Sequence, residues 1–192
     1  MNCIHCESVV EKRFFCSKCL KILPILDYNY FTLLEISPNF DVNLESLELS
    51  FFTKLKKIHP DKFINFTSLE KDIATNNAAI LNAAYETLIN PLLKARYILE
   101  LHGYIVDGTV KISSSVMSEL FILREELEDV SSIHELNHIE SLIKEILKNL
   151  WNDISFKFKQ KLYKEAVQIY VDINFIEHFK KDIKQKKYIL DI

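Results

Sequence analysis

Apolar residues recur at spacings of three and four along most of this chain, which is the pattern of helices that bury one face. In the first half, one such stripe consists of Leu44, Leu47, Phe51, Leu55 and Ile58. A second stripe consists of Ile73, Ile80 or Leu81, Ala84 and Leu88. The two stripes predict two amphipathic helices, and the short segment between them predicts an antiparallel helical hairpin.

Polar residues mark the ends of these helices. Asp41 or Asn43 is placed to cap the first helix. Residues 67–70, with the sequence TSLE, have the capping-box pattern at the start of the second. Residues 90–91, Asn-Pro, end that helix and begin another, which runs to a C-terminal cap at Gly103. A shorter helix, with aromatic residues on one side, is predicted over residues 27–34.

Three further stripes follow residue 114. The first helix starts at about Ser115 and carries Met117, Leu120, Phe121, Leu123 and Leu127. A capping box at Ser132 and Glu135 opens the next, which carries Leu136, Ile139, Leu142, Ile143, Ile146, Leu147 and Leu150. The last region includes Leu162, Ala166, Ile169, Ile173, Ile176 and Phe179. Three such stripes predict a three-helix bundle, and the segment from Gly103 to Ser115, which holds both glycines, predicts a linker.

The composition favours an all-α fold and excludes some classes of function. Of the 192 residues, 48% are hydrophobic, whereas only 2 are glycine and 4 are proline. This length allows one or two small domains with cores of their own. The net charge of -3 gives no general attraction to nucleic acid or anionic membranes. No apolar run is long enough to cross a bilayer, and no signal or transit peptide is visible before the cysteines.

All four cysteines lie near the start of the chain as two CxxC pairs, Cys3 with Cys6 and Cys16 with Cys19. Such paired spacing brings four thiolates within reach of one tetrahedral ion, so we predict one structural zinc ion. A redox dithiol pair and an iron-binding knuckle are the alternatives, and two disulfides fit a reduced intracellular chain less well. His5 is expected to be an exposed side chain rather than a ligand, because four thiolates complete the shell.

The triplet His59, Pro60 and Asp61 falls at the turn of the predicted hairpin. Pro60 cannot continue a helix, and it keeps His59 out of helical geometry. The turn therefore presents an imidazole and a carboxylate to solvent. Nearby basic residues are Lys54, Lys56, Lys57 and Lys62. A run of lysines is usually a solvated face, but beside this turn we interpret it as a docking surface for an acidic partner.

Other chemistry is missing from the sequence. There is no Gly-rich phosphate loop, no nucleophile elbow and no second cluster of metal-ligating residues, so we expect no enzyme active site. Trp151 and Tyr170 are interpreted as packing residues rather than as part of a cofactor site.

Several motifs carry a resemblance to known proteins. The His59 triplet between two helices resembles the J-domain, the module that stimulates ATP hydrolysis by DnaK-type chaperones. In order along the chain, DYNYFTLL (27–34), HPDKF (59–63), NAAYETL (82–88), NPL (90–92), RYIL (96–99) and REEL (124–127) are similar to motifs of HscB-type J-protein co-chaperones of iron–sulfur cluster assembly. The N-terminal CxxC pairs look like those of the eukaryotic members. We therefore expect a zinc-binding module at 1–25, a J-domain at 26–103, a linker at 104–114 and a C-terminal helical bundle at 115–192.

This resemblance implies two partners and no catalytic residue. A DnaK-type chaperone would be met through His59, Pro60, Asp61 and the lysines at 54, 56, 57 and 62. An IscU-type iron–sulfur scaffold protein would be met through Met117, Phe121, Arg124, Glu125 and Phe175. The alternative is that Met117, Phe121 and Phe175 are ordinary core residues. Ser118 stands where the family has a large apolar residue and Ile122 where it has an acidic one, so the scaffold-binding face is expected to differ in shape and charge.

Other interpretations stay open at this point. The chain could be a general J-protein whose zinc module binds unfolded clients or mediates homodimerisation. The cysteines could instead carry iron or electrons. A nucleic-acid-binding zinc ribbon is disfavoured, because Lys12, Arg13, Lys18 and Lys21 form only a modest basic patch. The resemblance implies a mitochondrion or a mitochondrion-related organelle, with a cytosolic pool as the alternative.

Overall fold

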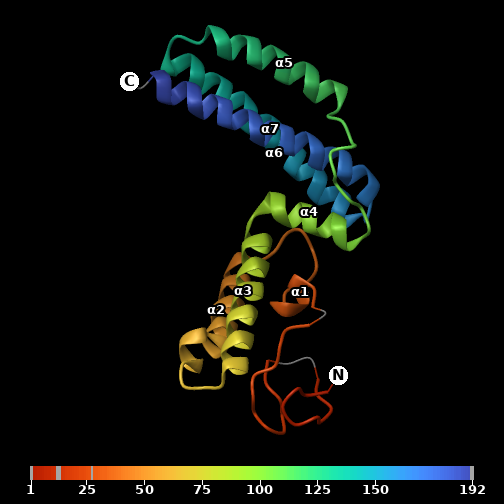
Figure 1. The fold of residues 1–192 in the computed structure, drawn as a ribbon. Helices are drawn as coiled ribbons and strands as arrows, with labels where there is room; N and C mark the ends of the chain where they lie inside the picture. Colours follow the sequence, from red (N-terminus) through yellow and green to blue (C-terminus); the bar gives the residue numbers. More distant parts are fainter. Residues whose placement is uncertain (1, 12–13, 27, 191–192) are drawn as a thin grey trace. The chain divides into compact units, whose positions relative to one another are not determined.

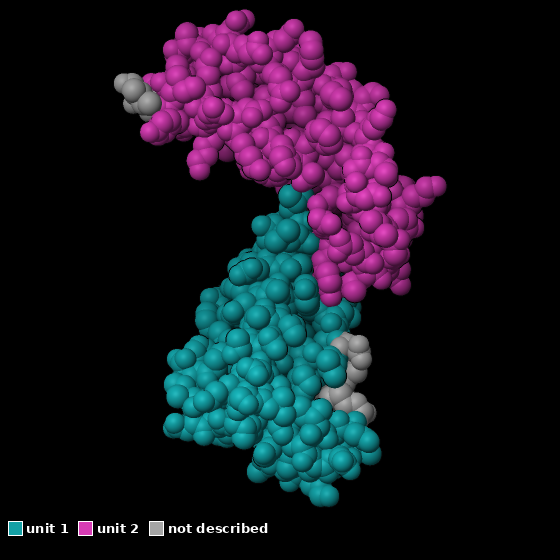
Figure 2. Space-filling model, viewed as in Figure 1, with its two compact units in different colours: residues 1–94 teal, residues 95–192 magenta. Residues whose placement is uncertain are grey.

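The regular structure of the described residues is helical, as the composition and the stripes predict (Figure 1). A computed structural model describes residues 2–11, 14–26 and 28–190, so the predictions made for Asp27, Lys12 and Arg13 lie outside the described residues. The chain forms two compact units, residues 1–94 and 95–192 (Figure 2). None of the helices in the described part is long and apolar enough to cross a bilayer.

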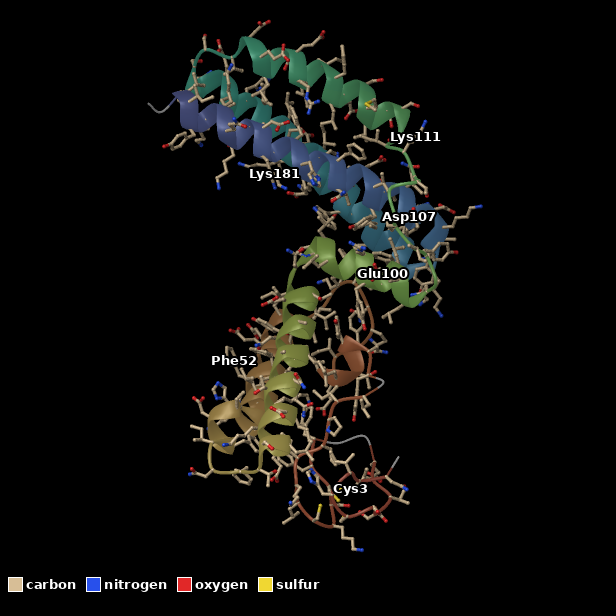
Figure 3. The ribbon with its side chains drawn as sticks, in the orientation of Figure 1. Cys3, Phe52, Glu100, Asp107, Lys111 and Lys181 are labelled. Carbon is tan, nitrogen blue, oxygen red and sulfur yellow. The ribbon has the colours of Figure 1, made fainter. Side chains whose placement is uncertain are left out.

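The first unit contains α1 (Tyr30–Leu33), α2 (Leu44–Ile58), the 3₁₀ turn η1 (Pro60–Phe63) and α3 (Ser68–Ile89). Helices α2 and α3 lie side by side as a hairpin (Figure 1). Phe51 of α2 stacks on Tyr85 of α3, with ring centroids 4.2 Å apart and planes at 17°. Leu44, which the stripe placed in the core, is exposed because it is the first residue of α2, and Phe52 lies on the outer face of the same helix (Figure 3).

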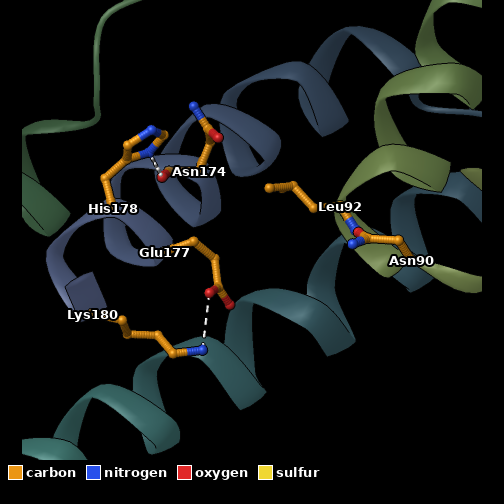
Figure 4. A network of polar contacts seen from close by, with 6 residues as sticks. All are labelled: Asn90, Leu92, Asn174, Glu177, His178 and Lys180. Atoms are coloured by element: carbon orange, nitrogen blue, oxygen red, sulfur yellow. Dashed lines mark hydrogen bonds and ion pairs between the residues drawn. The ribbon is translucent and has the colours of Figure 1, made fainter. Parts of the chain in front are cut away.

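Side-chain caps mark the starts of the helices, and of the two predicted candidates for α2, Asp41 and Asn43, it is Asn43 that caps the helix. Asn43 caps α2, since its Oδ1 accepts a hydrogen bond from the Ser46 backbone N–H at 2.8 Å. Both predicted capping boxes form, Thr67 with Glu70 and Ser132 with Glu135. Helix α4 (Pro91–Leu101) begins at Asn90, whose Oδ1 accepts from the backbone N–H groups of Leu92 and Leu93 (Figure 4).

The second unit contains the predicted three-helix bundle, α5 (Ser114–Asp129), α6 (Ile133–Lys159) and α7 (Tyr163–Leu190). Its fully buried core includes Leu136, Ile143 and Ile154 of α6 and Ile173 and Ile176 of α7. Helix α5 buries a narrower stripe, which consists of Val116, Leu123 and Leu127. The two long helices therefore form the main pair, and α5 leaves part of its apolar surface uncovered.

Two side chains of α7 hold the segment that leads into α5. The Gln168 amide donates to the Lys111 carbonyl at 3.0 Å, and the buried Asp172 carboxylate accepts from the Ser113 backbone N–H at 2.8 Å. Gly103 follows α4 with φ +82°, the conformation expected of a C-terminal cap. The compact units divide after Lys94, inside α4, so the predicted linker at 104–114 belongs to the second unit. The four predicted domain boundaries stay a prediction.

Buried Asn77 of α3 joins the irregular N-terminal segment to the hairpin. Its Oδ1 accepts from the Ile25 N–H at 2.9 Å, and its Nδ2 donates to the Leu23 carbonyl at 2.8 Å. One amide thereby satisfies a buried donor and a buried acceptor of the N-terminal segment. Asn77 occupies a stripe position of α3, four residues after Ile73, which is the sequence signal of a polar group that faces inward.

Asn77→Ala is expected to lower the free energy of unfolding by about 2–4 kcal/mol, because it leaves the Ile25 N–H and the Leu23 carbonyl buried without partners. Urea unfolding of the full chain measures this change. Asn76→Ala is the matched control, since Asn76 is the exposed neighbour on the same helix. An equal loss of stability in the two variants would contradict the role given to Asn77.

Candidate metal centre and docking surfaces

The two CxxC pairs fold into two equivalent knuckles. In the first, the Glu7 N–H donates to the Cys3 carbonyl at 2.9 Å and Glu7 has φ +59°. In the second, the Leu20 N–H donates to the Cys16 carbonyl at 3.0 Å and Leu20 has φ +60°. Each knuckle thus turns through a non-glycine residue in the left-handed region, which sequence alone does not indicate.

The four sulfur atoms converge on one point. All four Sγ atoms lie within 4.8 Å of one another, near Cys3 in Figure 3. The Cys3–Cys19 sulfurs are 3.7 Å apart and the Cys6–Cys16 sulfurs 3.8 Å apart. A tetrahedral zinc ion with Zn–S bonds of about 2.3 Å needs sulfurs about 3.8 Å apart. The donor set therefore has the chemistry and the spacing of a four-thiolate metal site.

Hydrogen bonds around the cluster favour thiolates. The Cys19 backbone N–H and the Ser8 hydroxyl lower the pKa of Cys16 to about 6, and hydrogen bonds from Ser8 lower the pKa of Cys6. At Cys19 the Lys21 backbone N–H lowers the pKa, but burial and the neighbouring sulfurs outweigh it and raise the pKa to about 12. Four such close sulfurs cannot all ionise unless a cation lies between them, which is the condition that a metal ion meets.

His5 takes no place among the four sulfur donors. Its Nε2 lies 3.0 Å from the Ile22 carbonyl, so the ring connects the first knuckle to the chain that leaves the second. The side chain is half-buried, not exposed as expected. The close group of donor atoms consists of the four cysteine sulfurs, and that His5 is not a ligand stays a prediction.

The His59 triplet forms the outer turn of the hairpin. His59 is the N-cap of η1, and its Nδ1 accepts from the Asp61 backbone N–H at 3.3 Å. Buried Phe63 holds the other end of this turn on the hairpin. The His59 and Asp61 side chains are 45% and 82% exposed, with His59 Nδ1 3.5 Å from Asp61 Oδ2. An imidazole and a carboxylate are thus presented together on a fixed corner.

The prediction that Lys54 belongs to the exposed lysine face is wrong. Lys54 is buried, its Nζ forms an ion pair with Glu35 Oε1 at 2.7 Å, and the same Nζ lies 5.8 Å from the Phe14 ring centroid. The reason lies in the tertiary structure, because Phe14 of the N-terminal segment and Glu35 in the turn after α1 both contact the Lys54 ammonium group. The exposed lysines beside the turn are Lys56, Lys57 and Lys62.

On the bundle, α5 and α7 enclose a groove of about 650 Å³, which we name the docking groove. Its apolar lining consists of Ile112, Met117, Leu120, Phe121, Phe175 and Phe179. Met117, Phe121 and Phe175 are 53%, 62% and 46% exposed, so they are not the core residues of the alternative interpretation. The fold brings these three and Arg124 together, whereas Glu125 is exposed outside the lining.

Sequence reasoning missed the polar side of this groove. Asp182 of α7 accepts a hydrogen bond from the Arg124 guanidinium at 3.1 Å, and Arg124 lies 5.6 Å from the Phe179 ring centroid. Asp182 and Arg124 are 58 residues apart, so no local pattern connects them. The available signal was spacing on α7, since Phe175, Phe179 and Asp182 follow at intervals of four and three.

The C-terminal part of this chain matches a known protein family, and the whole chain resembles known proteins. Residues 113–184 match the family model described as the HSCB C-terminal oligomerisation domain. The human protein named iron-sulfur cluster co-chaperone protein HscB is 28% identical over 180 residues, which cover 92% of this chain and 77% of the human one. The mouse protein of the same name is 28% identical over 190 residues, which cover 97% and 81%.

Two solved structures match this chain over most of its length. The crystal structure of the human co-chaperone protein HscB matches with a TM-score of 0.92 and 27% identity, over 97% of this chain and 98% of that one. The chaperone HscB from Vibrio cholerae matches with a TM-score of 0.76 and 25% identity, over 85% of this chain and 99% of that one. With its four clustered cysteines, helical hairpin and C-terminal bundle, this chain is similar over nearly its whole length to the HscB co-chaperones of iron–sulfur cluster assembly.

Proposed function

We propose that this chain stimulates the ATPase of a DnaK-type chaperone and delivers an IscU-type iron–sulfur scaffold protein to it. The observation that carries the proposal is the docking groove, which gathers four of the five residues that the family resemblance assigns to scaffold contact. The hairpin turn supplies the second contact surface. The chain is then an activator of its partner's ATPase and not itself an enzyme.

The chaperone contact rests on the rigid corner at η1. Asp61 can form a charge-assisted hydrogen bond with a cation on the chaperone, and His59 beside it adds an imidazole. Lys56, Lys57 and Lys62 surround this corner with positive charge, which favours fast encounter with an acidic chaperone surface. Lys54 is left out of this surface, because its charge is already paired with Glu35.

The scaffold contact rests on exposed apolar anchors. Met117 and Phe121 project from α5 and Phe175 from α7, so a partner side chain placed between them is covered from both helices. Because one chain holds both partners, binding of the scaffold raises its local concentration near the chaperone. ATP hydrolysis by the chaperone then favours tight binding of the scaffold and release of its cluster to an acceptor.

The cysteine module would hold one zinc ion through Cys3, Cys6, Cys16 and Cys19, with a structural role. The metal would hold together two loops that bury little apolar surface of their own. The hydrogen bonds of Asn77 would then fix this module against the hairpin. We propose a mitochondrion or a mitochondrion-related organelle as the location, with a cytosolic pool as the alternative. The second candidate function is homo-oligomerisation through residues 113–184, which the description of the matching family model favours.

His59→Gln is expected to reduce stimulation of the chaperone ATPase about tenfold or more. The reason is that a hydrogen bond to a charged group of the partner is worth about 1.5–3 kcal/mol, and the substitution removes such a contact. Steady-state ATPase assays with a DnaK-type chaperone measure this. His138→Gln, which changes an exposed histidine of α6, is the matched control. Full stimulation by His59→Gln would refute the chaperone role. If added scaffold does not change the stimulation of the chaperone ATPase by this chain, the proposal that the chain connects the two partners is wrong.

A Met117→Ser/Phe121→Ala/Phe175→Ala variant is expected to bind an IscU-type scaffold about a hundredfold more weakly, because it removes three apolar anchors at once. Isothermal titration calorimetry measures the affinity. The control variant is Ile105→Ser/Phe156→Ala/Tyr188→Ala, which removes three exposed apolar side chains of the same unit outside the docking groove.

Two results would count against the scaffold role. One is a parent chain that fails to bind scaffold, and the other is an equal loss of affinity in the two triple variants. Sedimentation of the parent chain over a range of concentrations separates the oligomerisation alternative, since a groove occupied by a second copy predicts dimers that the first triple variant abolishes.

The purified chain is expected to contain one zinc ion and no visible absorption, as measured by elemental analysis and spectroscopy. Cys16→Ser is expected to lose the metal, whereas His5→Ala, the matched control, is expected to keep it, because His5 lies outside the donor set. Chelation should loosen the cysteine module and leave the helical signal of the bundle intact, since none of the described residues between 2 and 26 is in a helix. Iron with a coloured spectrum would contradict the structural zinc assignment.

A further inference from the structure

The hollow between α5 and α7 continues beyond the docking groove at both ends. Toward the N-terminus of α5, a hollow of about 500 Å³ shares Ile112, Met117 and Phe175 with the docking groove. Toward the C-terminus of α5, a hollow of about 420 Å³ shares Arg124 and Asp182 with it. The seam is therefore open along its length, and Arg124 and Asp182 meet where two of its parts join.

Arg124 is held in one place from two sides at this junction. Its Nη2 donates to Asp182 Oδ2 at 3.1 Å, and its guanidinium carbon lies 5.6 Å from the Phe179 ring centroid. The Arg124 side chain is nonetheless 63% exposed. A guanidinium has five N–H donors, so the contact with Asp182 leaves donors for another molecule.

The Arg124–Asp182 pair is not required to hold α5 against α7. At the start of α5, the buried Asp172 carboxylate accepts from the Ser113 N–H at 2.8 Å. At its end, Lys186 Nζ donates to the Glu128 carbonyl at 2.9 Å. Leu123 and Leu127 are buried between these two points. Loss of the pair in the middle therefore frees the guanidinium and leaves the helix in place.

We infer that Asp182 and Phe179 are positioning residues that hold the Arg124 guanidinium as the polar recognition group of the docking groove. The partner that fits carries an apolar side chain for the space among Met117, Phe121 and Phe175, with a hydrogen-bond acceptor beside it. That acceptor is a carboxylate or a main-chain carbonyl, because a guanidinium can only donate. This inference rests on the proposed function, in which the partner is the iron–sulfur scaffold.

Charge and entropy both favour this role. Lys181 lies on the same rim as Arg124, so the rim offers two cations against the single carboxylate of Asp182. An arginine that is already held in its bound orientation loses less side-chain freedom when a partner arrives. Arg124 is the charged residue that α5 contributes to the lining of the docking groove.

The test measures scaffold affinity by calorimetry for the full-length parent, Asp182→Ala and Glu177→Ala. Glu177→Ala is the matched control, because it removes the acidic partner of another exposed ion pair on α7, Glu177 with Lys180, outside the docking groove (Figure 4). We expect Asp182→Ala to weaken binding about three- to fivefold, the scale of an exposed ion pair, and Glu177→Ala to leave it unchanged. Arg124→Ala should weaken binding about tenfold.

A double-mutant cycle decides whether Asp182 acts through Arg124. In the Arg124→Ala background, Asp182→Ala should have no further effect on affinity, since the group that it positions is gone. Without any partner, the side-chain Nε–H NMR signal of Arg124 should shift and broaden in Asp182→Ala but not in Glu177→Ala. Thermal unfolding should be the same for both variants, because neither pair holds the bundle together.

The outcomes separate this inference from the proposed function. No scaffold binding by the parent contradicts both. Binding by the parent with no loss in Asp182→Ala, or with the same loss in the Arg124→Ala background, contradicts the positioning role alone. The salt dependence of the Arg124→Ala effect identifies the acceptor: a carboxylate predicts an effect that shrinks at high salt, and a main-chain carbonyl predicts one that does not.

Discussion

Each helix of this chain carries one apolar stripe, and the need to bury that stripe places both candidate interfaces. The stripes of α2 and α3 cover each other, so the turn that joins them faces solvent and presents His59 with Asp61. In the bundle, α6 and α7 cover each other, while α5 buries only Val116, Leu123 and Leu127. Met117, Leu120 and Phe121 of α5 line a groove, and α4, the other helix with residues in this unit, contributes no residue to its lining.

The N-terminal segment follows a different principle, since it has no stripe. Its two knuckles bury Cys3, Val10, Cys16 and Leu23, a cluster too small to fold without a cross-link. Four converging sulfurs supply the site for that cross-link, and the Asn77 amide ties the segment to α3. The cysteine module therefore packs on the hairpin, and the same packing places Phe14 over Lys54 of α2 and buries that lysine.

Each compact unit carries one of the two candidate interfaces, which agrees with the proposal that this chain connects two partners. Neither surface has catalytic chemistry of its own: one is a rigid polar corner, and the other is an apolar groove with a fixed guanidinium. Such surfaces change rates by bringing molecules together and by selecting an arrangement in the partner. If the proposed scaffold binds this groove, Arg124 and its contact with Asp182 of α7 are the polar part of the surface that it meets.

Local patterns in the sequence determined the helices, the caps at Asn43, Thr67, Asn90 and Ser132, the paired cysteines and the turn at Pro60, because each depends on neighbours within a few residues. Spacing alone could not decide which residues on a stripe meet solvent. Lys54 is buried because distant Phe14 and Glu35 cover it, Phe121 is exposed because nothing covers it, and Asp182 meets Arg124 across 58 residues. Those choices belong to the tertiary structure, since burial and ion pairing depend on which segments lie together in space and not on their order in the chain.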